Sequence, residues 1–210
     1  MLVKICGITR FEDADAAVMA GATALGFVFW PRSPRFIDPY RARAIAAALP
    51  PFVTTVGVFV NQPIAYVNGI ASLAGLAAVQ LHGDEDAAFA AAVRRPVIKA
   101  IALDAGDAGA SAWPGRYTLL LDAHDAERRG GIGRTIDWAR AAEVAASRRV
   151  VLSGGLTPEN VSDAVARVRP FGIDVSSGVE QSPGVKDHDR LKALFKALQS
   201  ATTVVRAFDE

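Results

Sequence analysis

The residues that could do chemistry include a single cysteine, Cys6, at the end of a short apolar segment. Lys4 stands two positions earlier, so an amine and a thiol share one face if this segment is a strand. The thiol could serve as a general base if neighbouring positive charge lowered its pKa from about 8.5. Lys4 could supply that charge, or it could be the buried ion-pair partner of Asp174. The alternative is an inert cysteine, because free cysteine is usually buried.

Three further polar residues suit other steps of a reaction. Asp122 follows the apolar run 119–121, and a partly desolvated carboxyl group tends to keep its proton, as a general acid must. The alternative for Asp122 is capping of the loop that follows. Arg35 lies in a proline-rich segment, where a guanidinium could clamp a planar carboxylate through paired hydrogen bonds, whereas Arg32 is expected at the surface. His82 follows another apolar segment and is expected to play a supporting role.

Two turns of small residues near the end of the chain could bind phosphate. Gly154 and Gly155 would let the backbone approach a ligand closely, and Ser177 and Gly178 offer a hydroxyl and exposed amides. Each turn alone could simply shape a tight loop. Together, after the last two expected strands, they predict a phosphate site.

The elements that must position these residues follow a regular alternation of strand and helix. Such alternation indicates a parallel sheet, and eight units of about 26 residues each are near the lower limit for a (β/α)8 barrel. An open doubly wound sheet is the alternative. The expected strands are 3–6, 24–29, 54–60, 77–81, 96–101, 117–121, 149–152 and 172–175. The expected helices are 11–20, 39–49, 63–73, 84–93, a short or poorly formed one within 104–113, then 136–146, 158–168 and 187–198.

Composition narrows the function classes. The chain has 210 residues, 51% of them hydrophobic, and a net charge of +1 without a basic block. We therefore expect one domain spanning 1–210, with no nucleic-acid partner and no attraction to an anionic membrane. One cysteine cannot form an internal disulfide, and no leader or membrane-spanning run is evident, so a cytoplasmic protein is expected. The tail after residue 200 is expected to fray.

The sequence lacks the motifs that would indicate a bound metal or nucleotide cofactor, because the candidate residues have the wrong spacing or do not follow a strand. Cys6, His82 and the acidic residues are scattered, without the compact spacing of a metal site. There is no nucleotide-binding P-loop, and the glycines of 130–133 do not directly follow a strand, so the dinucleotide fingerprint fails. No metal and no cofactor are expected.

Short motifs recur near the ends of the expected strands. In order, the motifs are Lys4-Ile5-Cys6-Gly7-Ile8-Thr9, Gly26-Phe27-Val28-Phe29 with Ser33-Pro34-Arg35, Val58-Phe59-Val60-Asn61, Val79-Gln80-Leu81-His82-Gly83, Leu121-Asp122, Gly130-Gly131-Ile132-Gly133 with Asp137-Trp138, Leu152-Ser153-Gly154-Gly155-Leu156 with Asn160, and Asp174-Val175-Ser176-Ser177-Gly178-Val179-Glu180 running on into Pro183-Gly184 and Lys186-Asp187. Together these motifs resemble the phosphoribosylanthranilate isomerase family of tryptophan biosynthesis over essentially the whole chain, and no key position departs from the family pattern.

The resemblance implies a cofactor-independent Amadori rearrangement of N-(5-phosphoribosyl)anthranilate to 1-(o-carboxyphenylamino)-1-deoxyribulose 5-phosphate. By this likeness Asp122 is the general acid and Cys6 the general base. Arg35 would hold the anthranilate carboxylate, and Asp174 would lie near the sugar hydroxyls. The phosphate would lie at Gly154, Gly155, Ser177 and Gly178. The partner is thus a phosphorylated small molecule.

Several rival functions remain. A histidine-pathway isomerase or a bifunctional isomerase would be expected to carry an aspartate in place of Cys6, and an indoleglycerol-phosphate synthase would be expected to carry an extra N-terminal segment. The rival from another class is a non-catalytic phosphate-binding barrel. We also expect segment 124–134 to fold over the substrate, because excluding water protects a reactive imine. The chain is expected to be a monomer or a homodimer.

Overall fold

Parallel strands close into a barrel in the computed structural model, which describes residues 1–103, 108–123 and 136–208, with 108 and 201–208 described by backbone alone. Strand β1 pairs with both β2 and β8, and Lys4 lies opposite Asp174 in the register that closes the ring. The predicted barrel is confirmed, and an open sheet is excluded. The strands of the barrel are β1 (Leu2–Cys6), β2 (Ala24–Val28), β3 (Thr54–Phe59), β4 (Ala78–Leu81), β5 (Val97–Ala102), β6 (Thr118–Asp122), β7 (Val150–Leu152) and β8 (Gly172–Val175).

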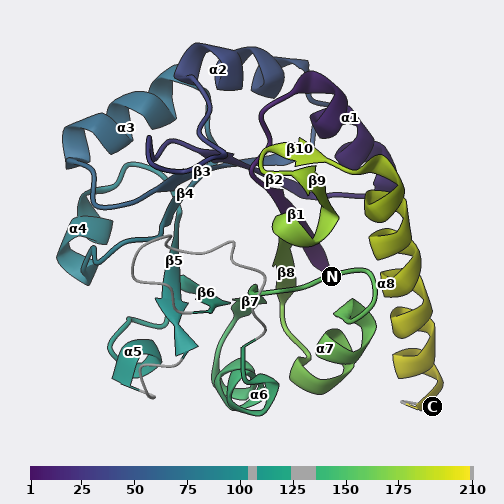
Figure 1. Ribbon diagram of the computed structural model, residues 1–210. Coiled ribbons are helices and arrows are strands. Elements are labelled where there is room, and N and C mark those ends of the chain that lie inside the picture. The colour runs from purple at the N-terminus through teal and green to yellow at the C-terminus, as the bar shows by residue number, and fades with distance from the viewer. Residues whose placement is uncertain (104–107, 124–135, 209–210) are drawn as a thin grey trace.

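Helices surround the barrel on its outside (Figure 1). Local sequence signals set several of their ends. Asp38 caps one helix by accepting hydrogen bonds from the amides of Tyr40 and Arg41, and Gly21 ends another in the left-handed conformation with φ 119°. The helices are α1 (Phe11–Ala20), α2 (Pro39–Ala48), α3 (Ile64–Leu73), α4 (Ala87–Ala92), α5 (Ala108–Ser111), α6 (Trp138–Ser147), α7 (Val161–Val168) and α8 (His188–Phe208).

Some boundaries differ from the sequence-based expectation. Helix α4 begins after Asp86, whose side chain accepts from the amide of Phe89 at 2.7 Å, rather than at residue 84. Glu85 takes no part in capping, because its carboxylate pairs with Lys99 at 3.1 Å. Helix α8 continues to Phe208, beyond the expected end at residue 198. The predicted lid, 124–134, lies outside the described residues.

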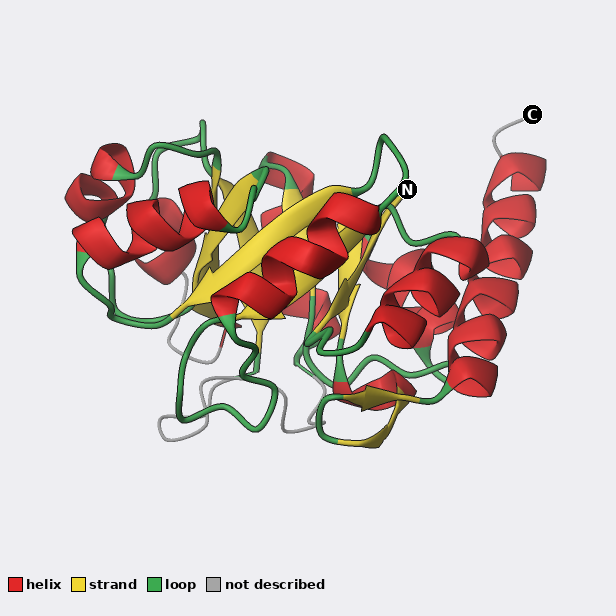
Figure 2. Ribbon diagram, turned by 90° about the horizontal axis from the view of Figure 1, so that it is seen from above, coloured by secondary structure: helices red, strands yellow, loops and turns green. Residues whose placement is uncertain are grey.

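A small antiparallel hairpin was not predicted at all. Its strands are β9 (Glu180–Ser182) and β10 (Val185–Lys186), and it follows a short 3₁₀ helix, η2 (Ser177–Val179). In Figure 2 the hairpin lies at the end of the barrel opposite the N-terminus, which is the end where the strands finish. The dipeptide Pro183-Gly184 forms its turn, and Gly184 adopts φ 82°.

Two apolar layers build the core. The larger one lies between the strands and the helices, and smaller clusters fill the barrel interior, for example Ala24 with Val56 and Ala78. Lys4 and Cys6 share a strand face, as predicted, and Cys6 packs beside Val28 inside the barrel. Buried polar side chains also lie on this inner face, among them Lys4, Gln80, Asp122 and Asp174, and this is where a site can form.

Candidate active site

A cavity of about 440 Å³ opens at the ends of the barrel strands. It gathers side chains from strands that are far apart in sequence, because the carboxyl ends of all strands in a parallel barrel meet at one face. Five of the nine predicted site residues line it: Cys6, Arg35, His82, Asp122 and Asp174. The other lining residues are Val28, Trp30, Arg32, Ser33, Pro34, Val58, Val60, Gln80, Ser153, Ser176 and Pro183.

Cys6 ends β1 and is buried, with 8% of its surface exposed. Its strand partner is Gly26, where an added Cβ would lie only 2.8 Å from the Cys6 sulfur. Glycine therefore leaves the space that the thiol occupies. The carbonyl oxygen of Cys6 accepts hydrogen bonds from Lys186 Nζ at 2.5 Å and from Ser176 Oγ at 3.1 Å. The thiol is thus carried on a strand end whose backbone is fixed from two sides.

Lys4 fulfils both of the roles that the sequence left open. Its Nζ lies 2.9 Å from Asp174 Oδ1, and both side chains are almost fully buried. Burial alone would lower the pKa of Lys4, but the charge of Asp174, aided by that of Cys6, outweighs it and leaves the pKa above the usual value. Lys4 is therefore a charged ion-pair partner of Asp174 and also a neighbour of the thiol.

The ionisation of Cys6 is nevertheless disfavoured overall. Burial raises the pKa of the Cys6 thiol above its ordinary value, and Asp174 acts in the same direction. Lys4 and Lys186 oppose this by favouring the thiolate, but they do not overcome the desolvation. The expected lowering of the thiol pKa by nearby charge is therefore present only as a partial compensation, and the resting group is a thiol.

Asp122 lies on the other side of the cavity and is 6% exposed. Its Oδ1 accepts from the amide of Ala123 at 2.8 Å, and its Oδ2 lies 3.3 Å from His82 Nε2. The other ring nitrogen of His82 lies 2.8 Å from Gln80 Nε2. With Gln80 as donor, neutral His82 carries its proton on Nε2 and presents it to Asp122. His82 therefore contacts Asp122 directly, and its supporting role stays a prediction.

Arg35 forms a forked ion pair with Glu180 of the hairpin, which was not expected. Its Nε and Nη2 donate to the two carboxylate oxygens at 2.9 and 2.7 Å. Among the described residues, Nη1 makes no hydrogen bond. Arg32, predicted at the surface, is exposed but also lines the mouth of the cavity. Glu180 and Lys186 belong to the motifs near the end of the chain, but no role was predicted for either; the signal available was the Pro183-Gly184 turn between them.

The predicted phosphate residues lie beside the cavity rather than in its lining. Gly154 and Gly155 follow β7 with φ of 84° and 62°, a conformation that glycine adopts without strain. Gly178 follows β8 and packs against the carbonyl of Leu156, leaving no space there for a side chain. Ser177 begins η2. The two turns are thus in direct contact, and the preceding serine of each turn lines the cavity.

A larger cavity of about 740 Å³ adjoins the first and shares His82 and Asp122 with it. Its remaining lining includes the buried pair Lys99 and Glu85, but it contains none of the thiol-side residues. We take the smaller cavity as the candidate active site because it holds both the thiol and the carboxyl group. Within the described ranges, no group of three or more His, Cys, Asp or Glu side chains is placed to hold a metal ion. Nor does that part of the chain contain a helix long and apolar enough to cross a membrane.

Comparison with known proteins gives a consistent result. The family model for N-(5'-phosphoribosyl)anthranilate isomerase matches residues 3–197. The protein of that name from Pseudomonas fluorescens strain Pf0-1 is 50% identical over 199 residues, which cover 93% of this chain and 97% of that protein.

Solved structures agree in fold and sequence. Phosphoribosylanthranilate isomerase from Thermus thermophilus superposes with a TM-score of 0.87 at 47% identity, covering 95% of this chain and 99% of that one. A second phosphoribosylanthranilate isomerase structure, in complex with reduced 1-(o-carboxyphenylamino)-1-deoxyribulose 5-phosphate, gives a TM-score of 0.82 at 42% identity, again over 95% and 99% of the two chains. This chain belongs to the N-(5'-phosphoribosyl)anthranilate isomerase family.

Proposed function

We propose that the protein isomerises N-(5'-phosphoribosyl)anthranilate to 1-(o-carboxyphenylamino)-1-deoxyribulose 5-phosphate, a step of tryptophan biosynthesis, with Asp122 and Cys6 as its acid and base. The observation that carries this proposal is that both groups line one cavity of about 440 Å³ together with Arg35. An acid, a base and a carboxylate clamp around one cavity suit a sugar that carries an aromatic acid.

Asp122 opens the ribose ring in the first step. Its carboxyl proton passes to the ring oxygen while the bond between that oxygen and C1 breaks, and the nitrogen lone pair forms a C=N bond. The product is a protonated Schiff base, and Asp122 is left as a carboxylate. The amide of Ala123, 2.8 Å from Oδ1, and His82, 3.3 Å from Oδ2, support the carboxylate that forms. A positioned acid typically contributes about 10²–10⁴-fold in rate.

Cys6 then removes the proton from C2 of the sugar. The electrons of that C–H bond form a C1=C2 bond, and the electrons of C=N return to nitrogen, which gives a neutral enolamine. The thiolate needed for this step lies beside the cations of Lys4 and Lys186, which favour it against the penalty of burial. Tautomerisation of the enolamine to the amino-ketose completes a reaction in which no atoms are gained or lost.

The remaining predicted residues bind the substrate. Arg35 receives the anthranilate carboxylate, and Asp174 lies near the sugar hydroxyls. The phosphate binds at Gly154 and Gly155 together with Ser177 and Gly178. Support comes from the contact between these two turns and from their place next to the cavity.

We further propose that the protein acts in the cytoplasm, as a monomer or a homodimer. A biosynthetic role on small phosphorylated metabolites supports that location. For assembly, the similar phosphoribosylanthranilate isomerase from Thermotoga maritima is described as dimeric.

The test is turnover of freshly prepared phosphoribosylanthranilate by the purified protein. The fluorescence of the anthranilate ring reports loss of substrate, and mass spectrometry identifies the product. We expect rapid conversion, and no conversion of the aminoaldose substrate of the histidine-pathway isomerase. A folded protein that binds phosphorylated ligands but converts neither substrate would be a binding module. Conversion of only the second substrate would establish the rival isomerase.

A further inference from the structure

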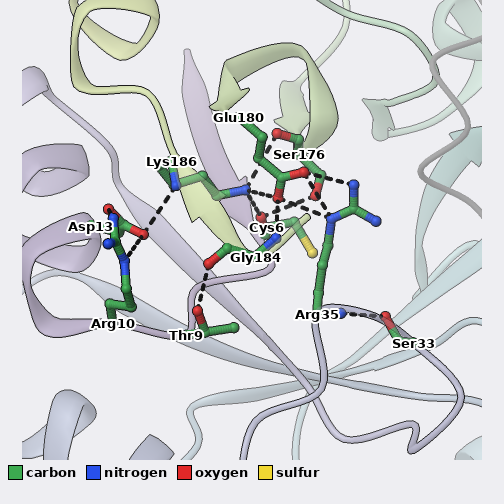
Figure 3. Close-up of polar contacts among 10 residues, drawn as sticks. All are labelled: Cys6, Thr9, Arg10, Asp13, Ser33, Arg35, Ser176, Glu180, Gly184 and Lys186. Carbon is green, nitrogen blue, oxygen red and sulfur yellow. Dashed lines mark hydrogen bonds and ion pairs between the residues drawn. The ribbon is translucent and has the colours of Figure 1, made fainter. Parts of the chain in front are cut away.

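The β9–β10 hairpin is fixed to the barrel by the residues that follow β1. The hydroxyl of Thr9 donates to the carbonyl of Gly184 at 2.5 Å, and the amide of Lys186 donates to Asp13 Oδ2 at 3.0 Å. Asp13 is fully buried and is itself held by Arg10 (Figure 3) and by the ring of His188. The turn and β10 are therefore held in a defined place next to the end of β1, and the buried Lys186 shares that fixed position.

Glu180, the first residue of the hairpin, orients Arg35. Its two oxygens accept from Nε and Nη2 of Arg35, a planar fork-to-fork arrangement that permits only one orientation of the guanidinium. Figure 3 shows the Glu180 carboxylate lying between Arg35 on one side and Lys186 on the other. Within the described chain Nη1 makes no hydrogen bond, so this edge is left to receive a carboxylate.

Lys186, the last residue of the hairpin, fixes the backbone of Cys6. Its side chain is fully buried, and Nζ donates to the carbonyl of Cys6 at 2.5 Å, to that of Ser176 at 3.3 Å and to Glu180 Oε1 at 2.8 Å. An ammonium group has three protons to donate, so each has a partner. Burial lowers the pKa of Lys186, while Glu180 opposes this, and Glu180 is its only carboxylate partner among the described residues.

The charges around Cys6 leave one positive charge in excess. The cations are Lys4, Arg35 and Lys186, and the anions are Asp174 and Glu180. Ion pairing alone would require only as many cations as anions. Lys186, whose charge lowers the pKa of the Cys6 thiol, is one of the nearby cations that a buried thiolate needs.

We propose that Glu180 and Lys186 of the hairpin are positioning residues for the reaction: Glu180 aligns Arg35 to receive the substrate carboxylate, and Lys186 fixes the Cys6 backbone and supplies the charge that balances its thiolate. This rests on the roles proposed above for Cys6 and Arg35. It extends the site to a hairpin whose side chains need not touch the reacting atoms.

The experiment for Lys186 measures ionisation of Cys6 directly. Cys6 is the only cysteine, so the rate of alkylation by iodoacetamide as a function of pH reports this one thiolate without requiring turnover. The charged groups that act most strongly on Cys6 are Lys4 on β1, Asp174 on β8 and Lys186 on β10, and the ion pairs of Glu180 with Arg35 and Lys186 complete the cluster. In Lys186→Met we expect the alkylation midpoint to rise by about one pH unit. We also expect kcat/KM near neutral pH to fall about tenfold.

Matched variants separate charge from packing. Lys186→Arg keeps the charge and should keep the midpoint within a few tenths of a unit of wild type. Lys192→Met removes an exposed cation, 74% accessible on α8, and should change nothing. If Lys186→Met does not fold, Lys186→Gln takes its place, since an amide still donates a hydrogen bond. A folded neutral variant with the wild-type midpoint would overturn the role of Lys186.

The role of Glu180 predicts a different kinetic signature. In Glu180→Gln the forked pair is lost, so we expect KM to rise about tenfold while kcat falls less than about threefold. An unchanged KM would overturn the role of Glu180. Absence of turnover in wild type would instead refute the proposed function, and the alkylation profiles would still decide whether Lys186 acts on the thiol.

Discussion

The two sides of the cavity are built differently. On the thiol side, Cys6 is surrounded by buried ion pairs, Lys4 with Asp174 and the hairpin pair Lys186 with Glu180. On the carboxyl side, Asp122 has one backbone amide and the ring of His82 at 3.3 Å, and no cation other than a protonated His82 pairs with it among the described residues.

The difference suits the roles proposed for the two groups. A buried thiol that acts as a base must form an anion, and desolvation opposes this by raising the pKa of Cys6. It therefore needs nearby cations that are themselves held in place by anions. A carboxyl group that acts as an acid starts neutral, and nearby cations would favour loss of its proton before the substrate arrives. The sparse surroundings of Asp122 suit that role.

The largest expected effect comes from removing either reacting group. Cys6→Ser and Asp122→Asn should each lower kcat by about 10²–10⁴-fold, because each removes one proton transfer. Binding of a phosphorylated product analogue should persist, since neither change touches the two phosphate turns. Steady-state kinetics and calorimetric titration measure the two effects. Variants that retain wild-type turnover would remove the acid-base roles while leaving the activity in place.

Removing Lys4 tests how the thiol side is held together. Lys4→Met leaves Asp174 buried without its partner at 2.9 Å, which typically costs about 3–5 kcal/mol of stability. Denaturant unfolding measures this loss. The double variant Lys4→Met with Asp174→Leu removes both charges and should recover much of the stability. If the single variant is as stable as wild type, the pair is not needed for folding.

The pH dependence of kcat/KM in the Asp122→Asn variant reports the ionisation of the proposed base, Cys6. Because the pKa of Cys6 is raised, the thiolate fraction grows with pH throughout the neutral range, and residual kcat/KM should rise about tenfold per pH unit. A flat profile in Asp122→Asn would indicate that Cys6 is not the base.

The smallest effect is expected for His82. Its contact with Asp122 is long at 3.3 Å, so His82→Gln should lower kcat by only about three- to tenfold. Gln is of similar size and retains a hydrogen-bond donor for the cavity. Single-turnover measurements can separate a slower ring opening from slower product release. A loss as large as that of Asp122→Asn would show that the carboxyl side depends on its surroundings as strongly as the thiol side does.

The sequence by itself determined the barrel and most of the site. Strand and helix alternate strictly, and apolar strands end in unusual polar residues, so a parallel barrel brings Cys6, Asp122 and Asp174 together wherever its loops go. The caps at Asp38 and Gly21 are also local signals, because each satisfies the helix end next to it. Periodicity and caps act over a few residues, which is why they can be read from the chain.

Only the tertiary structure decided which charges pair. Arg35 and Glu180 are 145 positions apart, and Cys6 and Lys186 are 180 apart. The Pro183-Gly184 turn is a local signal for a hairpin, but no local pattern indicates that this hairpin packs next to the end of β1 and carries these side chains to the thiol. The raised pKa of Cys6 has the same origin, because desolvation depends on everything packed around a group rather than on its neighbours in sequence.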